Sequence, residues 1–274
     1  MKKIEIKTIG VLLGAIFLSL LIVECSTVPL TGRRQLSLVP ESEMVSMSLT
    51  GYKSFIDTNK VINDANALLV KKVGKNLSKA VEKYLTDNGF SSRVADFQWE
   101  FNTVSNSEPN AWCMPGGKVC FYSGIFPYTK NEAGIAVVMG HEIAHAVARH
   151  GSERMSDGML VQFGGVALST AISQKPQQVQ NLYMTAFGVG SQYGVVLPFS
   201  RKQEYEADKM GLIFMAIAGY NPSEAINFWE RMSQKGGSSV PEFMSTHPVD
   251  ANRIASLKQL LPTAMQYYKK DIRK

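Results

Sequence analysis

The residues best suited to do chemistry form the segment His141-Glu142-Ile143-Ala144-His145, which has the pattern H-E-x-x-H. Side chains four residues apart project from one face of a helix, so His141 and His145 can bind the same metal ion. Glu142 can reach a water molecule held by that ion. The pattern therefore predicts a zinc hydrolase site in which the two histidines are ligands and Glu142 is the base.

A catalytic zinc site usually has a third protein ligand, which must come from another part of the chain. Glu204 and Asp208 lie four residues apart in a predicted helix and share a face. Glu204 could complete the ligand set, while Asp208 could accept a hydrogen bond from the outer nitrogen of a ligand histidine. Taken alone, this spacing is typical of a solvated helix face. Its combination with the H-E-x-x-H pattern favours the metal interpretation.

The segment around His141 has the features of a buried helix. Thr129 and Glu132 form a T-x-x-E pattern, which predicts a capping box at the helix start. Gly140 is unfavourable inside a helix and indicates close packing against the backbone. Apolar residues recur at helical spacing at positions Ile135, Val138, Met139, Ile143, Ala146 and Val147.

Several motifs together resemble a known family. They are the HEIAH segment, residues 200–211 with the sequence SRKQEYEADKMG, Thr246-His247-Pro248 and Arg253-Ile254. In this order they resemble the CaaX prenyl protease family (peptidase family M48) of gluzincin zinc endopeptidases. Its soluble bacterial branch contains periplasmic lipoprotein proteases of envelope quality control. The resemblance extends over residues 31–261, roughly, which is most of the chain.

The resemblance implies roles for individual residues. It makes His141, His145 and Glu204 the ligands of one Zn²⁺ ion and Glu142 the base. It also places His247 near the metal, where it would either donate to the oxyanion or occupy the open coordination position as a latch. Arg253 and Arg149 are both candidates to pair with Asp208 or Glu206. His150 is five residues from His145, off the ligand face of a continuous helix, and is expected to be structural.

Residues 109–117 resemble the N-A-x-x-x-P-G-G hairpin that lies beside the active site in this family. An edge strand over residues 110–114 could pair with an extended substrate. Its first residues, Asn110, Ala111 and Trp112, are the expected substrate strand. Cys113 and Cys120 lie on the two arms of this hairpin. They are expected either to form a disulfide or to remain two free buried thiols.

The N-terminus has the layout of a secretory signal. Three lysines precede the apolar residues 9–23, and Cys25 follows. We expect residues 1–24 to be a lipoprotein signal peptide, Cys25 to be lipidated, residues 25–39 to be a linker and residues 40–274 to be the metallopeptidase domain. Glu24 departs from the small residue usual before a lipidated Cys. The alternative is an uncleaved anchor, although about 15 apolar residues are short for a membrane span.

The composition indicates one globular domain. The net charge of +6 is scattered, and no basic-aromatic patch or phosphate loop indicates nucleic-acid binding. The patterns predict an α+β, mainly helical gluzincin-type fold with a small sheet beside the active-site helix. The expected helices cover residues 40–56 and 64–88, the HEIAH segment, two stretches within 152–192, one ending at 219, and one from 221 to about 236. The expected strands are 97–101 and a hairpin over 112–122, and a loop over 235–246 would deliver His247.

Two classes of function remain open. The first is a zinc endopeptidase that acts on unfolded or misassembled envelope proteins, anchored by its lipid and facing the periplasm at the outer membrane of a bacterial cell. The second is a non-catalytic, chaperone-like or binding module on a metallopeptidase fold. An intact Glu142 favours the first, since a binding module has no need for a base. Residues 152–192 are expected to be core helices or, alternatively, a mobile lid with glycine hinges.

Overall fold

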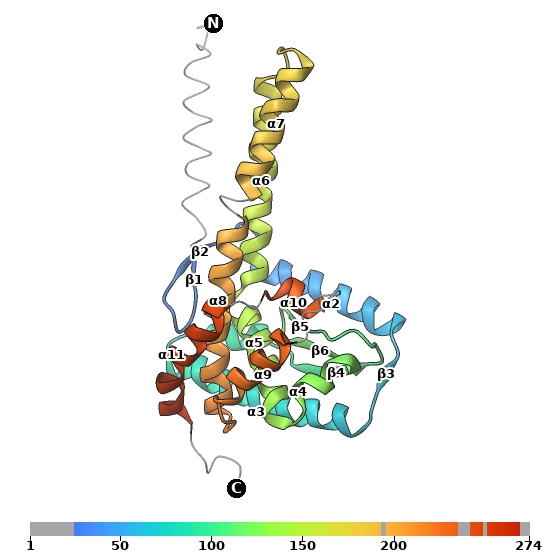
Figure 1. The fold of residues 1–274 in the computed structure, drawn as a ribbon, viewed down its shortest axis with the longest axis vertical. Coiled ribbons are helices and arrows are strands. Elements are labelled where there is room, and N and C mark those ends of the chain that lie inside the picture. Colours follow the sequence, from blue (N-terminus) through green and yellow to red (C-terminus); the bar gives the residue numbers. More distant parts are fainter. Residues whose placement is uncertain (1–24, 193–195, 235–241, 249–250, 269–274) are drawn as a thin grey trace, which may run out of the picture.

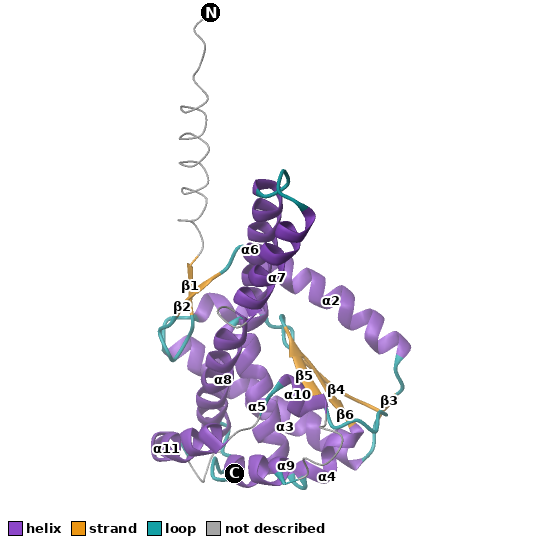
Figure 2. Cartoon of the chain, turned by 45° about the horizontal axis from the view of Figure 1, so that its top comes forward, coloured by secondary structure: helices purple, strands orange, loops and turns teal. Residues whose placement is uncertain are grey.

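The computed structural model describes residues 25–192, 196–234, 242–248 and 251–268 (Figure 1). It is mainly helical, with one four-stranded sheet and a two-stranded hairpin (Figure 2), which confirms the predicted α+β class. The expected signal peptide, residues 1–24, lies outside the described residues. Among the described helices, none is long and apolar enough to cross a membrane.

The main sheet has four strands in the order β3-β4-β6-β5, with β4 and β6 parallel and the other pairs antiparallel. These strands are β3 (Val61–Ile62), β4 (Glu100–Val104), β5 (Ala111–Met114) and β6 (Lys118–Tyr122). The predicted strand 97–101 is thus shifted by three residues. The reason is that the backbone N–H groups of Gln98 and Glu100 bond to the carbonyls of Gly116 and Gly117 in the β5–β6 turn.

Two helices near the predicted positions cover the sheet. Helix α2 (Glu41–Thr58) packs Tyr52 and Phe55 against Trp112 on one face. Helix α3 (Ala65–Asp87) covers the other face, where Gly74 allows the ring of Phe101 to approach closely. The side chain of Asp64 caps α3 by accepting a hydrogen bond from the backbone N–H of Ala67.

The centre of the molecule is the crossing of α5 (Glu132–Ala148) and α8 (Leu197–Ile217). Every residue of α5 from Gly134 to Ala148 is buried, as expected for a helix packed on all sides. Gly140 faces Gly211, and a Cβ at Gly211 would lie 2.9 Å from the backbone nitrogen of His141. The close packing predicted at Gly140 is therefore confirmed. The predicted capping box is wrong, because the helix starts after Asn131, whose side chain accepts from Gly134 N–H.

Helices α6 (His150–Ala171) and α7 (Gln177–Ser191) form a hairpin that extends away from the rest of the domain (Figure 1). Its buried side chains lie in the first turns of α6, and α7 has none. The expectation of ordinary core helices is therefore wrong for most of residues 152–192. Arg149 separates α5 from α6 in a left-handed conformation with φ of 58°.

The C-terminal part contributes α9 (Glu224–Ser233), α10 (Glu242–Thr246) and α11 (Ala251–Tyr267). The loop predicted over residues 235–246 is wrong at its end, since residues 242–246 form a helix. Residues 235–241 lie outside the described residues. The backbone N–H of Phe243 in α10 bonds to the carbonyl of Pro109 just before β5, so α10 lies next to the start of that strand.

The N-terminal residues form a hairpin of β1 (Cys25–Thr27) and β2 (Arg34–Leu36) that packs onto the domain. Val28 is fully buried, and the Gln35 side chain donates to the carbonyl of Ala148 at the end of α5. Leu38 N–H donates to the hydroxyl of Ser156 in α6. Residues 25–39, expected to be a linker, are thus packed against the helices of the domain.

The disulfide between Cys113 and Cys120 is contradicted, because both cysteines are free. The β5–β6 register pairs Cys113 with Val119 and Trp112 with Cys120. Neighbouring residues of a strand point to opposite faces, so the two thiols lie on opposite faces of the sheet. The alternative of two free thiols holds, with Cys120 buried and Cys113 half-buried.

Candidate metal centre

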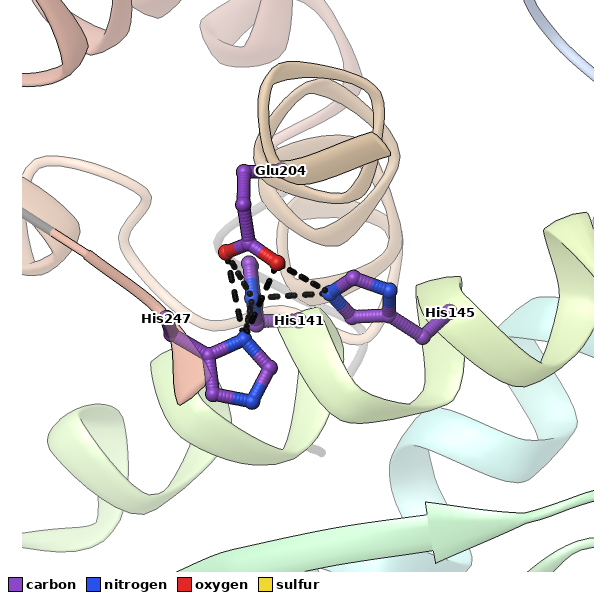
Figure 3. Close-up of side chains that lie close together, drawn as sticks. All are labelled: His141, His145, Glu204 and His247. Carbon is purple, nitrogen blue, oxygen red and sulfur yellow. Dashed lines mark hydrogen bonds and ion pairs between the residues drawn. The ribbon is translucent and has the colours of Figure 1, made fainter. Parts of the chain in front are cut away.

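The crossing of α5 and α8 brings together three side chains predicted as ligands (Figure 3). The Nε2 atoms of His141 and His145 lie 3.1 Å apart. Glu204 reaches across from α8 and places Oε2 3.3 Å from the Nε2 of His141 and Oε1 3.3 Å from the Nε2 of His145. All three side chains are buried. The close approach at Gly140 and Gly211 allows this, because Glu204 lies two turns before Gly211 on the same face of α8.

His247 completes a group of four potential ligands. Its Nδ1 lies 3.2 Å from His141 Nε2 and 3.1 Å from both oxygens of Glu204. Zinc–nitrogen bonds of about 2.0–2.1 Å place the ligand atoms of a tetrahedral site about 3.3 Å apart. Separations of 3.1–3.3 Å join His141 to the other three side chains and Glu204 to His145 and His247, and all four ligand atoms lie within 4.8 Å of one another. This donor set and its spacing fit one metal ion.

Burial would lower the pKa of His141, but hydrogen bonds to Asp208 and Glu204 raise it to about 9. His145 and Glu204, in contrast, have the protonation that a cation needs. Burial lowers the pKa of His145 well below its usual value and keeps the imidazole neutral. Burial would raise the pKa of Glu204, but the surrounding histidines hold it far below its usual value. Metal ligands must be neutral imidazoles and ionised carboxylates. These two side chains are therefore in the ligand form.

Glu142 lies on the same helix and is buried beside the cluster. Its Oε1 has no hydrogen-bond partner among the described residues, and the Nε2 of His247 is 3.4 Å away. Burial raises the pKa of Glu142, while His247 and His141 oppose the shift. A buried carboxylate oxygen without a donor is costly unless a ligand or water supplies one. Glu142 is thus available to a molecule bound at the cluster.

Asp208 and Arg253 lie behind His141. The Nδ1 of His141 is 3.0 Å from Asp208, which forms two bonds of 2.6 and 2.8 Å with the Arg253 guanidinium. Arg253 also reaches Glu204 at 2.9 Å and stacks 4.0 Å above the ring of Trp229. Of the two arginines considered as partners of Asp208 or Glu206, Arg253 is therefore the one that pairs with Asp208. Arg149 pairs with Asp96 and Glu41 instead.

The partner of His145 was not predicted from the sequence. The Nδ1 of His150 lies 2.9 Å from Nδ1 of His145, and its Nε2 lies 3.0 Å from Glu206. A continuous helix would direct His150 away from His145, but the left-handed Arg149 turns α6 so that the two rings meet. Glu206 is buried and linked to the cluster through His150.

The predicted substrate strand lies at the edge of the sheet. Strand β5 pairs with β6 on one side, and no described strand pairs with its other edge. Asn110 and Ala111 are buried, and the ring of Trp112 packs against Phe55 of α2 rather than toward the cluster. The backbone of β5 therefore presents an open edge, while the Trp112 side chain supports the far face of the sheet.

Comparison with known proteins identifies relatives of this chain. Residues 72–261 match the model described as "Peptidase family M48". The chain is 34% identical over 209 residues to the "Mitochondrial metalloendopeptidase OMA1" of Saccharomyces cerevisiae, covering 73% of this chain and 58% of that protein. It is 28% identical over 263 residues to the "Metalloendopeptidase OMA1, mitochondrial" of Homo sapiens, covering 92% of this chain and 49% of that one.

A bacterial relative is also found. The "Beta-barrel assembly-enhancing protease" of Escherichia coli is 29% identical over 177 residues, covering 61% of this chain and 36% of that protein. The chain thus matches between about a third and somewhat more than half of the length of each of these three relatives.

Proposed function

Because the chain belongs to peptidase family M48, we propose that it is a zinc-dependent endopeptidase that hydrolyses peptide bonds in protein substrates. The observation that carries this proposal is the cluster of His141, His145, Glu204 and His247, whose ligand atoms all lie within 4.8 Å of one another. A bound zinc ion would supply a Lewis acid that activates water and polarises the scissile carbonyl. A structural zinc site would more commonly contain cysteines, and none lies in this group.

Glu142 is the proposed base. Its carboxylate is buried next to the ligand atoms and has an oxygen without a donor. Burial raises the pKa of Glu142 from its usual value toward neutral pH. This suits a group that takes a proton from the attacking water and passes it to the leaving amine. Asp208 would hold His141 in position by accepting its outer N–H, and Arg253 would hold Asp208.

The open edge of β5 is the proposed binding place for the substrate backbone. An extended peptide could add a strand beside residues 111–114 through main-chain hydrogen bonds. Such binding depends little on side chains and exposes each carbonyl in turn. It suits unfolded or misassembled proteins, whose segments are free to become extended.

His247 is proposed to act as a latch. Its Nδ1 has the distance expected for the fourth ligand, and its Nε2 faces Glu142. In this position it would exclude water from the metal and keep basal activity low. The opposing role, donation to the oxyanion, would require the ring to leave the cluster when substrate binds.

The test of the proposed function is Glu142→Gln in the full chain. We expect zinc content to be retained and digestion of casein to fall by about 10²–10⁴-fold, because the amide cannot accept the proton. Glu132→Gln, on the first turn of the same helix, is the matched control and should digest casein normally. If Glu142→Gln digests casein at the wild-type rate, Glu142 is not the base. A zinc-loaded wild type that does not digest casein would instead support the non-catalytic, chaperone-like or binding module of the second hypothesis.

The proposed location is the bacterial cell envelope, with a lipid on Cys25 and the domain facing the periplasm at the outer membrane. The signal-like residues 1–24 and the envelope-related name of the Escherichia coli relative support this. Cys25→Ala should move the protein from the membrane to the soluble fraction, because the lipid supplies much of its membrane affinity. Cys120→Ala is the control. Membrane retention of the Cys25 variant with residues 1–24 still attached would indicate an uncleaved anchor.

A further inference from the structure

The two histidines on α5 are supported in different ways. His141 bonds directly to a carboxylate, that of Asp208. His145 instead meets a second histidine, His150, whose far nitrogen bonds to Glu206. His150 is fully buried and Glu206 is 6% exposed, so bulk water cannot replace either bond. The proposed function does not use His150 or Glu206, which leaves the purpose of this buried pair to be explained.

The hydrogen bonds of this pair settle where the protons lie. An ionised carboxylate only accepts, so the Nε2 of His150 carries the proton that bonds to Glu206. In a neutral ring the other nitrogen, Nδ1, is then an acceptor. The Nδ1 of His145, at 2.9 Å, must therefore be the donor. The Nε2 of His145 then carries no proton and faces the ligand cluster, where Oε1 of Glu204 is 3.3 Å away.

The N-terminal hairpin holds Glu206 in place. In the turn between β1 and β2, the hydroxyl of Thr31 donates to Oε1 of Glu206, and Nε of Arg33 donates to Oε2 at 2.8 Å. The outer nitrogens of Arg33 bind Glu153 of α6 at 2.5 and 2.7 Å. One arginine therefore connects the β1–β2 turn with α6 and α8. Its bidentate geometry gives the arrangement a fixed orientation.

We propose that His150 and Glu206 are positioning residues that fix the tautomer of His145, and that Thr31 and Arg33 of the N-terminal hairpin hold them in place. The proposal rests on the proposed function in that His145 is taken as a metal ligand. It makes the β1–β2 hairpin part of the support of the metal centre. A metal-ligating histidine needs its outer nitrogen protonated and its inner nitrogen free, and partners that secure this typically change metal affinity by about 10–100-fold.

The first test observes the protons directly in the metal-free full chain. The sequence contains four histidines, so the ¹⁵N resonances of their ring nitrogens can be assigned by substituting each in turn. We expect His145 to carry its proton on Nδ1 and His150 to carry its proton on Nε2. The reverse tautomer at either ring would overturn the proposal. Because no metal is involved, this result does not depend on whether the protein is a zinc enzyme.

The second test separates hydrogen bonding from packing. His150→Leu fills the space but cannot accept the proton of His145, whereas the side-chain oxygen of His150→Gln can. We expect zinc affinity, measured by competition with a chelator, to fall about 10–100-fold in the Leu variant and to stay within a few-fold of wild type in the Gln variant. Equal losses in both, or none in the Leu variant, would overturn the proposal.

Three further variants complete the test. Lys83→Ala removes an exposed ion pair with Asp87 in α3 and should leave zinc affinity unchanged. If His150→Leu does not fold, Glu206→Met and Glu206→Gln repeat the comparison, since only the amide can accept from His150. Loss of zinc affinity in Glu206→Met but not in Glu206→Gln supports the proposed positioning role of His150 and Glu206. Equal affinity in both variants overturns it. A wild-type chain that binds no zinc would refute the proposed function and leave the tautomer test intact.

Discussion

The crossing of α5 and α8 and the hairpin of α6 and α7 both contain glycines within helices, but the surroundings of those glycines differ. At the crossing, Gly140 and Gly211 lie so close that a Cβ on Gly211 would be 2.9 Å from a backbone atom of the other helix. In the hairpin, a Cβ on Gly158, Gly188 or Gly190 would meet no heavy atom within 4 Å among the described residues. Glycine is a packing requirement against backbone at the crossing. In the hairpin, Gly164 and Gly165 face only the ring of Phe187, at 3.1 and 3.4 Å from an added Cβ, and Gly158, Gly188 and Gly190 have open space within the described part of the chain.

The two regions also distribute polarity in opposite ways. The crossing buries charged and titratable side chains, which lie at His141, Glu142, His145, Glu204 and Asp208. Residues 158–192 of the hairpin contain a single charged residue, Lys175, and expose Phe163, Val166 and Leu182 by 54%, 62% and 68%. Buried charge is costly and is retained where it has chemistry to do, so the contrast locates the site in the crossing.

The largest expected effect concerns the ligand that α8 contributes to the crossing. Glu204→Ala should weaken zinc binding by more than the 10–100-fold typical of losing an outer partner, because a direct ligand is removed. Metal content after dialysis against a weak chelator measures this. Glu230→Ala, at a surface carboxylate paired with Lys258, is the control and should keep its zinc. Equal zinc in the Glu204 variant and wild type would mean that the metal is not held at the crossing.

Much of the crossing could be predicted from sequence because it follows helical spacing. Two pairs of residues lie four positions apart, His141 with His145 and Glu204 with Asp208. This spacing places each pair on one face of a helix. Gly140 correctly indicated a close neighbour. The identity of that neighbour, Gly211, could not be predicted, because it depends on which faces of two distant helices meet.

The remaining features depend on single residues that leave the regular pattern. The left-handed conformation of Arg149 brings His150 to His145, and no glycine or proline at that position marks the break. Similarly, the β5–β6 pairing differs by one residue from the register that would place Cys113 opposite Cys120, and this moves the thiols to opposite faces. Helical spacing fails at Arg149 because it assumes an unbroken helix. Pairing of the two cysteines fails in the hairpin because it assumes a particular turn.

The next effect concerns His247, which lies at the proposed fourth ligand position of the crossing. His247→Ala should raise basal proteolysis several-fold at equal zinc occupancy, because water would regain the fourth position. The measurement is the initial rate of casein cleavage in samples with matched zinc content. A fall of about 10²–10³-fold would instead assign His247 to stabilisation of the oxyanion. An unchanged rate would exclude both roles.

A smaller effect is expected from adding one methyl group at the crossing. In Gly211→Ala the new Cβ would meet the backbone of Gly140 and His141 at 2.9–3.1 Å, so the helices must separate. Overpacking of this kind costs about 1–3 kcal/mol of unfolding free energy. Since Glu204 is on the same face of α8, zinc affinity should fall as well. Denaturant unfolding and chelator competition measure the two effects, and a variant that matches wild type in both would contradict the close crossing.

The smallest effect is expected from the same substitution in the hairpin. Gly158→Ala adds a methyl group within α6 where nothing lies nearby, so it should stabilise the chain by about 0.5–1 kcal/mol through the lower conformational entropy of the unfolded state. Zinc affinity should not change. Unfolding measured beside Gly211→Ala under identical conditions provides the comparison. A loss of stability in Gly158→Ala would mean that another surface covers the base of the hairpin in solution, and the exposed apolar side chains beyond it would then belong to an interface.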